Sequence, residues 1–162
     1  MTSAKAQLLD LLADPHRDLT LVQGAVMVLE AQRQRGDLAQ LVGTWHLRWT
    51  SGTRQSQQWQ RGLWMQAAPA SPPGAIYQRI SPEGLEGSTP YLETIAAWGP
   101  LYLTVAGPFT YGENHRLAFT FEKTALGWGK LPALTVPMGN WAKGWLQTTY
   151  LDGDLHIERG DR

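Results

Sequence analysis

Apolar residues near the start of the chain recur with the spacing of an α-helix. Leucines cluster between residues 4 and 12, after Ser3, which is a favoured N-cap residue, and Pro15 stops the run. A second group is spaced by three and four residues, namely Leu19, Val22, Val26 and Leu29. Gly36 suits a helix C-terminus. The pattern predicts a short helix over 4–12 and a second helix that begins near Leu19 and is capped at Gly36.

Beyond Gly36 the period changes from 3.6 to 2, which is typical of half-buried β-strands. Six segments alternate clearly and two more weakly, with Gly, Pro and Asn turns between them; they are 41–50, 76–80, 101–107, 116–122, 145–151 and 154–159, then 59–66 and 91–98. Residues 67–74 and the apolar stretch 127–139 are interpreted as loops. Consecutive strands without intervening helices predict an antiparallel meander, and closure into a barrel removes its exposed edges.

The alternation also predicts which side chains share the barrel interior. Trp45 and Trp49 fall on one face of their strand. Extending this parity along the chain predicts an interior formed by Trp45, Leu47, Trp49, Leu103, Val105, Phe119, Phe121, Tyr150 and Ile157. It places Thr44, His46, Arg48, His156 and Glu158 in solvent.

The last hairpin carries the strongest local turn signal. Asp152-Gly153 is typical of a type I′ turn, which requires positive φ at both central residues. Such a turn would pair Tyr150 with Leu155, Thr148 with Ile157 and Leu146 with Arg159. We therefore expect Arg159 to point inward and to pack on the Trp45 ring, where it would close one end of the barrel.

Composition narrows the functional classes. The chain has 162 residues, 43% of them hydrophobic, and balances 14 Lys+Arg against 14 Asp+Glu, so we expect one domain over 1–162 and no nucleic-acid partner. The apolar runs are too short for a membrane span, and we expect no signal peptide. The four histidines lack metal-ligand spacing, and nucleophile-elbow and phosphate-loop motifs are missing from the sequence. We expect no enzymatic activity, no metal and no cofactor.

Two motifs at the ends of the β region resemble the plastid lipid-associated protein family, also called PAP/fibrillin, which occurs in plastids and cyanobacteria. The first is Gly43-Thr44-Trp45 with Trp49-Thr50, and the second is the hairpin 148–161, which runs through Thr-Thr-Tyr-Leu-Asp into Arg-Gly-Asp. The Tyr77-Gln78 pair is similar to the Gln-containing strand of that family. The resemblance implies a cyanobacterial-type member with a lipocalin-like β-barrel after two N-terminal helices. It also implies association with thylakoids or lipid bodies and handling of apolar isoprenoid-type compounds.

Three functions are consistent with this interpretation. The first is a carrier of a quinone, carotenoid or similar lipid, held by a site made of Trp45, Trp49, Gln78, Val105, Phe119, Phe121, Thr148, Tyr150 and Arg159. The second is a scaffold that coats lipid bodies or thylakoids, or supports an isoprenoid-processing enzyme as a protein partner. The third is a chromophore lyase. An apolar cavity of roughly 300 Å³ or more would favour the carrier, and a filled interior would favour the scaffold.

Overall fold

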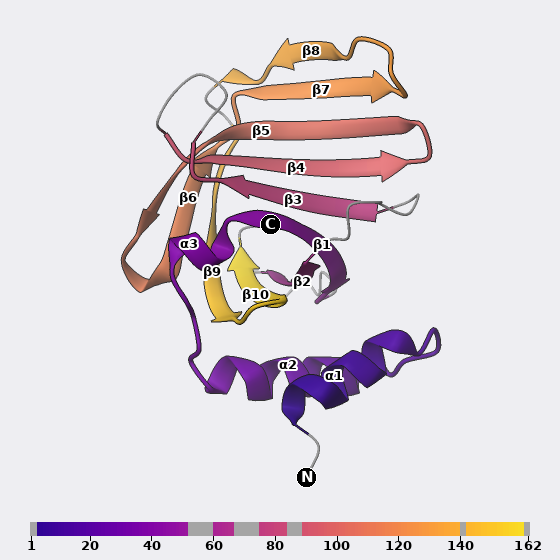
Figure 1. Ribbon diagram of the computed structural model, residues 1–162, viewed down its shortest axis with the longest axis vertical. Coiled ribbons are helices and arrows are strands. Elements are labelled where there is room, and N and C mark those ends of the chain that lie inside the picture. The colour runs from indigo at the N-terminus through magenta and orange to yellow at the C-terminus, as the bar shows by residue number, and fades with distance from the viewer. Residues whose placement is uncertain (1–2, 52–59, 67–74, 84–88, 140–141, 161–162) are drawn as a thin grey trace.

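The computed structural model describes residues 3–51, 60–66, 75–83, 89–139 and 142–160. Within them the chain forms three α-helices, one 3-10 turn and ten strands (Figure 1). The helices are α1 (Ala4–Ala13), α2 (Leu19–Ala31) and α3 (Leu38–Leu41), and the 3-10 turn is η1 (Glu113–His115). The strands are β1 (Gly43–Thr50), β2 (Gln60–Gln66), β3 (Ala75–Ser81), β4 (Tyr91–Trp98), β5 (Leu101–Gly112), β6 (Arg116–Thr120), β7 (Lys123–Trp128), β8 (Leu134–Pro137), β9 (Lys143–Leu151) and β10 (Leu155–Gly160).

Eight antiparallel strands close into a barrel. Their order is β4-β3-β1-β2-β10-β9-β6-β5, and the pairing of β4 with β5 closes the ring. Each of the eight predicted strands corresponds to one of these, which confirms the mainly β fold, the antiparallel barrel and the two preceding helices. The predicted loop 67–74 lies outside the described residues.

Strand β5 belongs to the barrel and also to a sheet that extends beyond it. Residues 109–112 pair with β6, whereas residues 101–106 pair with β7, which in turn pairs with β8. We call residues 101–106, β7 and β8 the wing. At the fork, a Cβ on Gly107 would lie 1.9 Å from the Thr120 carbonyl oxygen, so only glycine allows the link after β6 to pass this close.

The predicted loop 127–139 is therefore wrong in part, because β7 ends at Trp128 and β8 occupies Leu134–Pro137. Its residues alternate with period 2 on both sides of a tight turn at Gly129, whose φ is +56°. The Gly and Pro residues that define this hairpin turn gave the whole stretch the composition of a loop.

Both long helices cover the outside of the barrel at β2, β9 and β10 (Figure 1). Ser3 accepts from the Ala6 N–H, which confirms the predicted N-cap of α1. Helix α2 ends at Ala31 rather than at Gly36, and Gly36 instead makes a positive-φ turn that packs closely on Leu151. A capping box between Asp37 and Gln40 then begins α3, which the periodicity did not predict because it is only four residues long.

The carboxylate of Glu30 lies at the interface of α2 with the barrel, where 7% of its side chain is exposed. It accepts hydrogen bonds from Arg159 Nε and a terminal guanidinium nitrogen (3.1 and 3.0 Å), from Arg61 Nε (3.1 Å) and from Thr149 Oγ1 (2.8 Å). Burial by itself would raise the pKa of Glu30, but the bonds from Arg159 and Thr149 and the charge of Arg61 lower it. Arg159 thus points outward to α2, and its predicted packing on Trp45 is wrong.

The register of the last hairpin explains this correction. Tyr150 pairs with Ile157, a bulge follows, and Thr148 pairs with Glu158. Neither Asp152 nor Gly153 has positive φ, so the predicted type I′ turn is wrong. Asp152 Oδ1 instead accepts from the Asp154 and Leu155 N–H groups at 3.2 and 2.9 Å, which supports a longer loop.

Several predicted orientations are reversed as a result. Tyr150 and Ile157 face the helices, whereas His156 and Glu158 are buried inside the barrel. Trp49 also faces the helices because a bulge interrupts β1 between Leu47 and Trp49. The inward orientation of Trp45 and the outward orientation of His46, which stacks on Tyr77, are as predicted.

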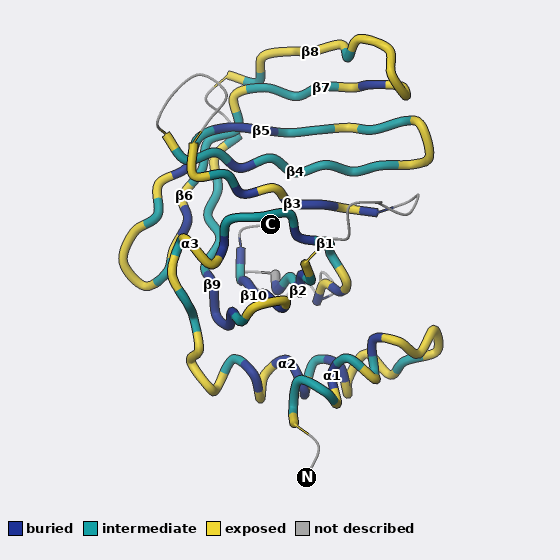
Figure 2. The backbone as a smooth tube through the Cα atoms, viewed as in Figure 1, coloured by how far each residue is buried: buried dark blue, intermediate teal, exposed yellow. Residues whose placement is uncertain are grey.

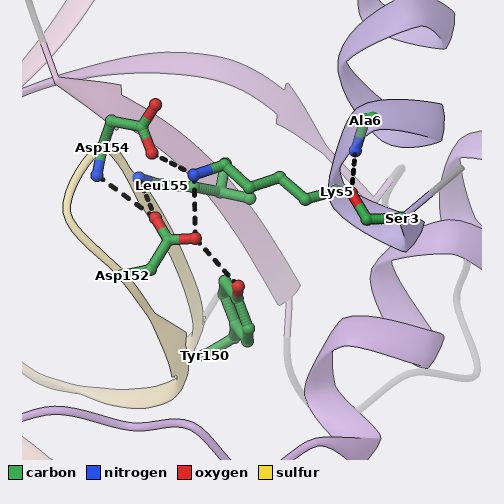
Figure 3. Close-up of polar contacts among 7 residues, drawn as sticks. All are labelled: Ser3, Lys5, Ala6, Tyr150, Asp152, Asp154 and Leu155. Atoms are coloured by element: carbon green, nitrogen blue, oxygen red, sulfur yellow. Dashed lines mark hydrogen bonds and ion pairs between the residues drawn. The ribbon is translucent and has the colours of Figure 1, made fainter.

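A small cluster of polar side chains connects helix α1 to the loop between β9 and β10 (Figure 3). Lys5 Nζ contacts the carboxylates of Asp152, at 2.9 Å, and Asp154, and Tyr150 donates to Asp152 at 2.8 Å. Burial by itself would raise the pKa of Asp152, but the hydrogen bonds from Lys5, the Asp154 N–H and Tyr150 lower it to about 2. Burial and the bond to Asp152 raise the pKa of Tyr150 to about 12.

Glu30→Gln should lower the free energy of unfolding by about 3 kcal/mol, because it leaves two arginines at a buried interface without their carboxylate. Urea unfolding at neutral pH measures the change. Glu93→Gln is the control, since Glu93 forms an exposed ion pair with Arg79, and its effect should stay within about 0.5 kcal/mol. Equal effects of the two substitutions would contradict the role assigned to Glu30.

Asp152→Asn should remove a specific part of the acid sensitivity. The folded-state pKa of Asp152 is about 2, against an ordinary value of 3.8, so its stabilisation is present above pH 4 and is lost as the pH falls toward 2. Wild type should therefore lose about 2 kcal/mol more than the variant across this window. Asp154→Asn is the control, because Asp154 is largely exposed. Parallel stability curves for wild type and Asp152→Asn would contradict the assignment.

Candidate functional site

One end of the barrel is closed by packed side chains. Trp45 is fully buried there, and its indole N–H donates to the Leu41 carbonyl of α3 at 2.8 Å. The apolar residues around it come from most of the barrel strands and include Ile80, Leu92, Phe109, Leu117 and Leu151. This half of the interior is a solid core.

The other half opens to the surface as a cavity of about 300 Å³, which we call the mouth pocket. It lies where β1 ends and where β2 and β3 begin. Its apolar walls are Leu47, Trp64, Ile76 and Leu146, and the remaining lining residues are Thr50, Arg61, Gly62, Glu158 and Gly160. The barrel is therefore neither empty nor filled throughout.

Trp64 and Glu158 line the base of the mouth pocket, and they adjoin a buried group of polar side chains that do not line it. Trp64 Nε1 donates to Glu158 Oε1 at 2.7 Å, and Gln78 also donates to this carboxyl group. His156 Nε2 lies 3.8 Å from Glu158 Oε2 and 3.3 Å from Thr148 Oγ1. We call these five residues, Trp64, Gln78, Thr148, His156 and Glu158, the lumen cluster. All five are buried, so they are shielded from bulk solvent.

Burial sets the protonation state of this cluster. It raises the pKa of Glu158 to about 8, although the hydrogen bonds from Trp64 and Gln78 act in the opposite direction. It lowers the pKa of His156 to about 3. At neutral pH the cluster therefore contains a protonated carboxyl group and a neutral imidazole. A protonated carboxyl group is a hydrogen-bond donor, so this base suits a neutral carbonyl or hydroxyl group.

Two polar atoms of the lumen cluster are unpaired within the described part of the chain, although neither residue lines the mouth pocket. Among the described residues, Gln78 Oε1 and His156 Nδ1 are buried and have no hydrogen-bond partner. Such atoms cost about 1–3 kcal/mol each when they stay unpaired. A bound molecule or a water that reached them would recover this free energy.

Two glycines keep the pocket open beside Glu158. A Cβ on Gly62 would lie 2.8 Å from Trp64 Nε1 and 3.4 Å from Glu158 Oε1. A Cβ on Gly160 would lie 2.6 Å from a methyl group of Leu146. Side chains at these positions would compete for the space around the Trp64–Glu158 hydrogen bond.

An apolar row leads from the pocket onto the wing. Directly paired residues share a face of a sheet, and five of them form a line across successive strands: Ile76, Ala96, Leu103, Leu126 and Leu134. This face is continuous with the barrel interior, because Gln78 lies two residues from Ile76 on β3 and pairs with Trp45. The wall of the mouth pocket thus continues outward as an exposed apolar surface.

The residues predicted as a ligand site are divided between several places. Trp45, Gln78 and Thr148 are inside the barrel, and Phe119 and Phe121 pack half-buried against its core. Val105 is half-buried on the wing, on the face of the apolar row. Trp49, Tyr150 and Arg159 lie outside the barrel, under the helices. The structure therefore brings together only part of the predicted set.

Sequence reasoning missed the polar residues at the base of the pocket. Glu158 and His156 were placed in solvent because they alternate with Ile157, and the bulge that reverses this interpretation has no clear sequence signal. Trp64 was assigned only to a weak strand. The glycines at positions 62 and 160 were the available hint, because glycine within a strand often marks a close approach or a ligand.

A second cavity, of about 310 Å³, lies on the opposite face of the sheet. Three of its charged groups are engaged, since Arg79 bonds Glu93 at 2.9 Å and Lys123 lies over the Tyr91 ring. Among the described residues, His, Asp and Glu side chains form no group of three that could hold a metal ion.

No helix in the described part of the chain is both long enough and apolar enough to cross a membrane.

Glu158→Gln should change how stability depends on pH. The folded protein keeps a proton on Glu158 up to about pH 8, whereas the unfolded chain loses it near pH 4.5. Wild-type stability should therefore fall relative to the variant between these values, by up to about 1.4 kcal/mol per pH unit. Unfolding by urea at a series of pH values measures this difference in the free energy of unfolding. Both proteins contain His156, so its own contribution cancels in the difference. A difference independent of pH would mean that Glu158 is ionised in the folded protein.

Comparisons with known proteins identify the family of the chain. Neither a curated protein nor a solved structure matches the chain. The family model PAP_fibrillin matches residues 4–162, which include both helices, the barrel and the wing. The chain therefore belongs to the PAP_fibrillin family.

Proposed function

We propose that the protein binds an apolar isoprenoid-type molecule, such as a quinone or a carotenoid, with its polar end in the mouth pocket. The observation that carries this proposal is the combination of apolar walls with an uncharged hydrogen-bonding base. Apolar walls supply the driving force for binding, and a few placed polar groups fix the orientation of the ligand.

The family supports the general class of this function. PAP/fibrillin proteins are generally lipid-associated and non-enzymatic. We place the binding activity at a photosynthetic membrane or lipid body, in line with the resemblance of the sequence. The protein would then hold or buffer its ligand without changing it chemically.

The size of the pocket limits what is bound inside it. A volume of about 300 Å³ is at the small end for a ligand site, so it suits a ring or head group but not a long prenyl tail. A carbonyl oxygen of the head group would accept from the protonated Glu158, and a hydroxyl group would donate to Gln78 Oε1. The tail would leave along the apolar row. Of the residues predicted from the sequence, Gln78 and Thr148 adjoin this site through Glu158 and His156, and Trp45 makes an edge contact with His156.

A scaffold that coats a lipid surface is the second candidate. The observation that favours it is the solid core around Trp45 and Phe109, which leaves only one half of the barrel for a ligand. In that case the mouth pocket would hold water, and the exposed apolar row would contact the lipid surface. The two candidates differ in whether a small soluble ligand saturates the pocket.

Ile76→Ser should weaken the binding of a short-tailed benzoquinone at least about tenfold, because it makes one wall of the pocket polar. Quenching of tryptophan fluorescence reports binding, since Trp64 lines the pocket. Leu103→Ser is the matched control, because the two side chains are 38% and 39% exposed on the same face of the sheet, and Leu103 lies outside the pocket. Equal affinity of both variants and wild type would place the ligand elsewhere. An absence of saturable binding to wild type would favour the scaffold.

A further inference from the structure

The wing ends in two adjacent turns that expose large apolar side chains. One turn follows Trp98 and the other follows Trp128, and these tryptophans are 54% and 56% exposed. Leu101 pairs with both of them, and the Gly129 N–H donates to the Pro100 carbonyl at 2.7 Å. We call residues 98–101 and 128–131 the tip. Figure 2 shows the two turns as exposed segments at the same end of the sheet.

The exposed apolar surface continues from the tip along one face of the wing. Leu126 and Trp128 lie on this face of β7, and Leu134 and Val136 lie on the same face of β8. All four are exposed. Exposed apolar side chains that are contiguous, unlike scattered ones, mark a surface that meets a partner.

The charge of this region identifies the kind of partner. The chain is neutral overall, yet residues 94–112 and 123–151 contain no Asp or Glu. Of the lysines in these stretches, Lys130 is exposed within the tip, whereas Lys123 lies over the Tyr91 ring on the opposite face and Lys143 begins β9 of the barrel. Tryptophan beside lysine at the rim of an apolar surface is typical of contact with a lipid headgroup layer.

A second copy of the chain is a poorer fit to the same surface. Strand β8 is the edge of the sheet, and it is only four residues long and ends in Pro137, a combination that blocks strand pairing. The tip and wing of another copy would also bring lysines together without acidic partners in these stretches.

We propose that the tip and the apolar face of the wing dock on a lipid surface that contains anionic lipid, with Trp98 and Trp128 in the headgroup region and Lys130 near the anionic groups. This inference deepens the proposed function, since the apolar row joins the docked face to Ile76 in the wall of the mouth pocket. A ligand tail would therefore pass from the lipid layer to the pocket along apolar side chains.

Co-sedimentation with vesicles of phosphatidylcholine, with or without phosphatidylglycerol, tests the docking site. The double substitution Trp98→Ser, Trp128→Ser should weaken vesicle binding at least about tenfold. Lys130→Glu should reduce the preference for vesicles that contain phosphatidylglycerol. The matched control is Leu21→Ser, Val28→Ser on α2, since these side chains are 56% and 54% exposed, and it should bind like wild type.

Three results would overturn the docking site: no vesicle binding by wild type, equal binding by the tip variant, or loss of binding in the α2 variant alone. If the tip variant binds vesicles like wild type, sedimentation equilibrium of the free protein tests the alternative partner. A dimer that dissociates in the tip variant, with unchanged vesicle binding, would assign the face to a second copy.

A parallel titration with the short-tailed benzoquinone in vesicle-free buffer separates this inference from the proposed function. The tip variant should keep quinone affinity, because Trp98 and Trp128 lie outside the mouth pocket. Vesicle binding that depends on the tip, together with no quinone binding by wild type, would overturn the pocket function and support docking. Quinone binding by wild type, together with vesicle binding that does not depend on the tip, would overturn docking and support the pocket function.

Discussion

The buried carboxylate of Glu30 determines which side chains the last strands present to the barrel interior. A charge at a buried interface must be paired, and Glu30 is paired by Arg61 on β2 and Arg159 on β10. The guanidinium groups of both arginines therefore point to the outer face of the wall, although Arg61 also borders the mouth pocket. Strand alternation places their neighbours on the inner face, where Gly62, Glu158 and Gly160 form one side of the mouth pocket. The register of β10 with β2 and β9 therefore determines both the interface with α2 and the lining of the pocket.

The two buried glutamates differ in ionisation because their partners differ. Glu30 receives hydrogen bonds from guanidinium groups, so it stays charged despite its burial. Among the described residues, Glu158 receives hydrogen bonds from neutral donors, Trp64 and Gln78, and burial raises its pKa to about 8. The bulge at Thr149 keeps these environments apart, because Thr149 turns outward to Glu30 while Thr148 turns inward to His156. The interior keeps polar groups without keeping a net charge, which suits a site for an apolar ligand with one polar end.

Much of the fold could be predicted because its signals are local. The helical spacing of Val22, Val26 and Leu29 and the alternation around Trp45 each span one element, and every barrel strand was found in this way. The site depends on contacts that are distant in sequence. Arg159 points outward because it bonds Glu30, which lies 129 residues away in the sequence. No local sequence pattern indicates that contact. The bulges that reverse the predicted orientations of Trp49 and Tyr150 place both side chains against the helices. The Asp152-Gly153 signal was misleading, because Asp152 is held by Lys5 and by the backbone of its own loop.

The fork at Gly107 connects the closed barrel with an open apolar surface. Because β5 changes partner from β7 to β6 there, the face that lines the barrel interior continues onto the wing without interruption. Alternation alone would also allow polar residues on this face, as at the half-buried Thr94 and Thr124. Leu103, Leu126 and Leu134 instead expose apolar area whose transfer out of water is worth about 25 cal/mol per Å². The polar base of the pocket and the apolar wing thus share one continuous face, which can hold the head of an amphipathic molecule at one end and contact a lipid layer at the other.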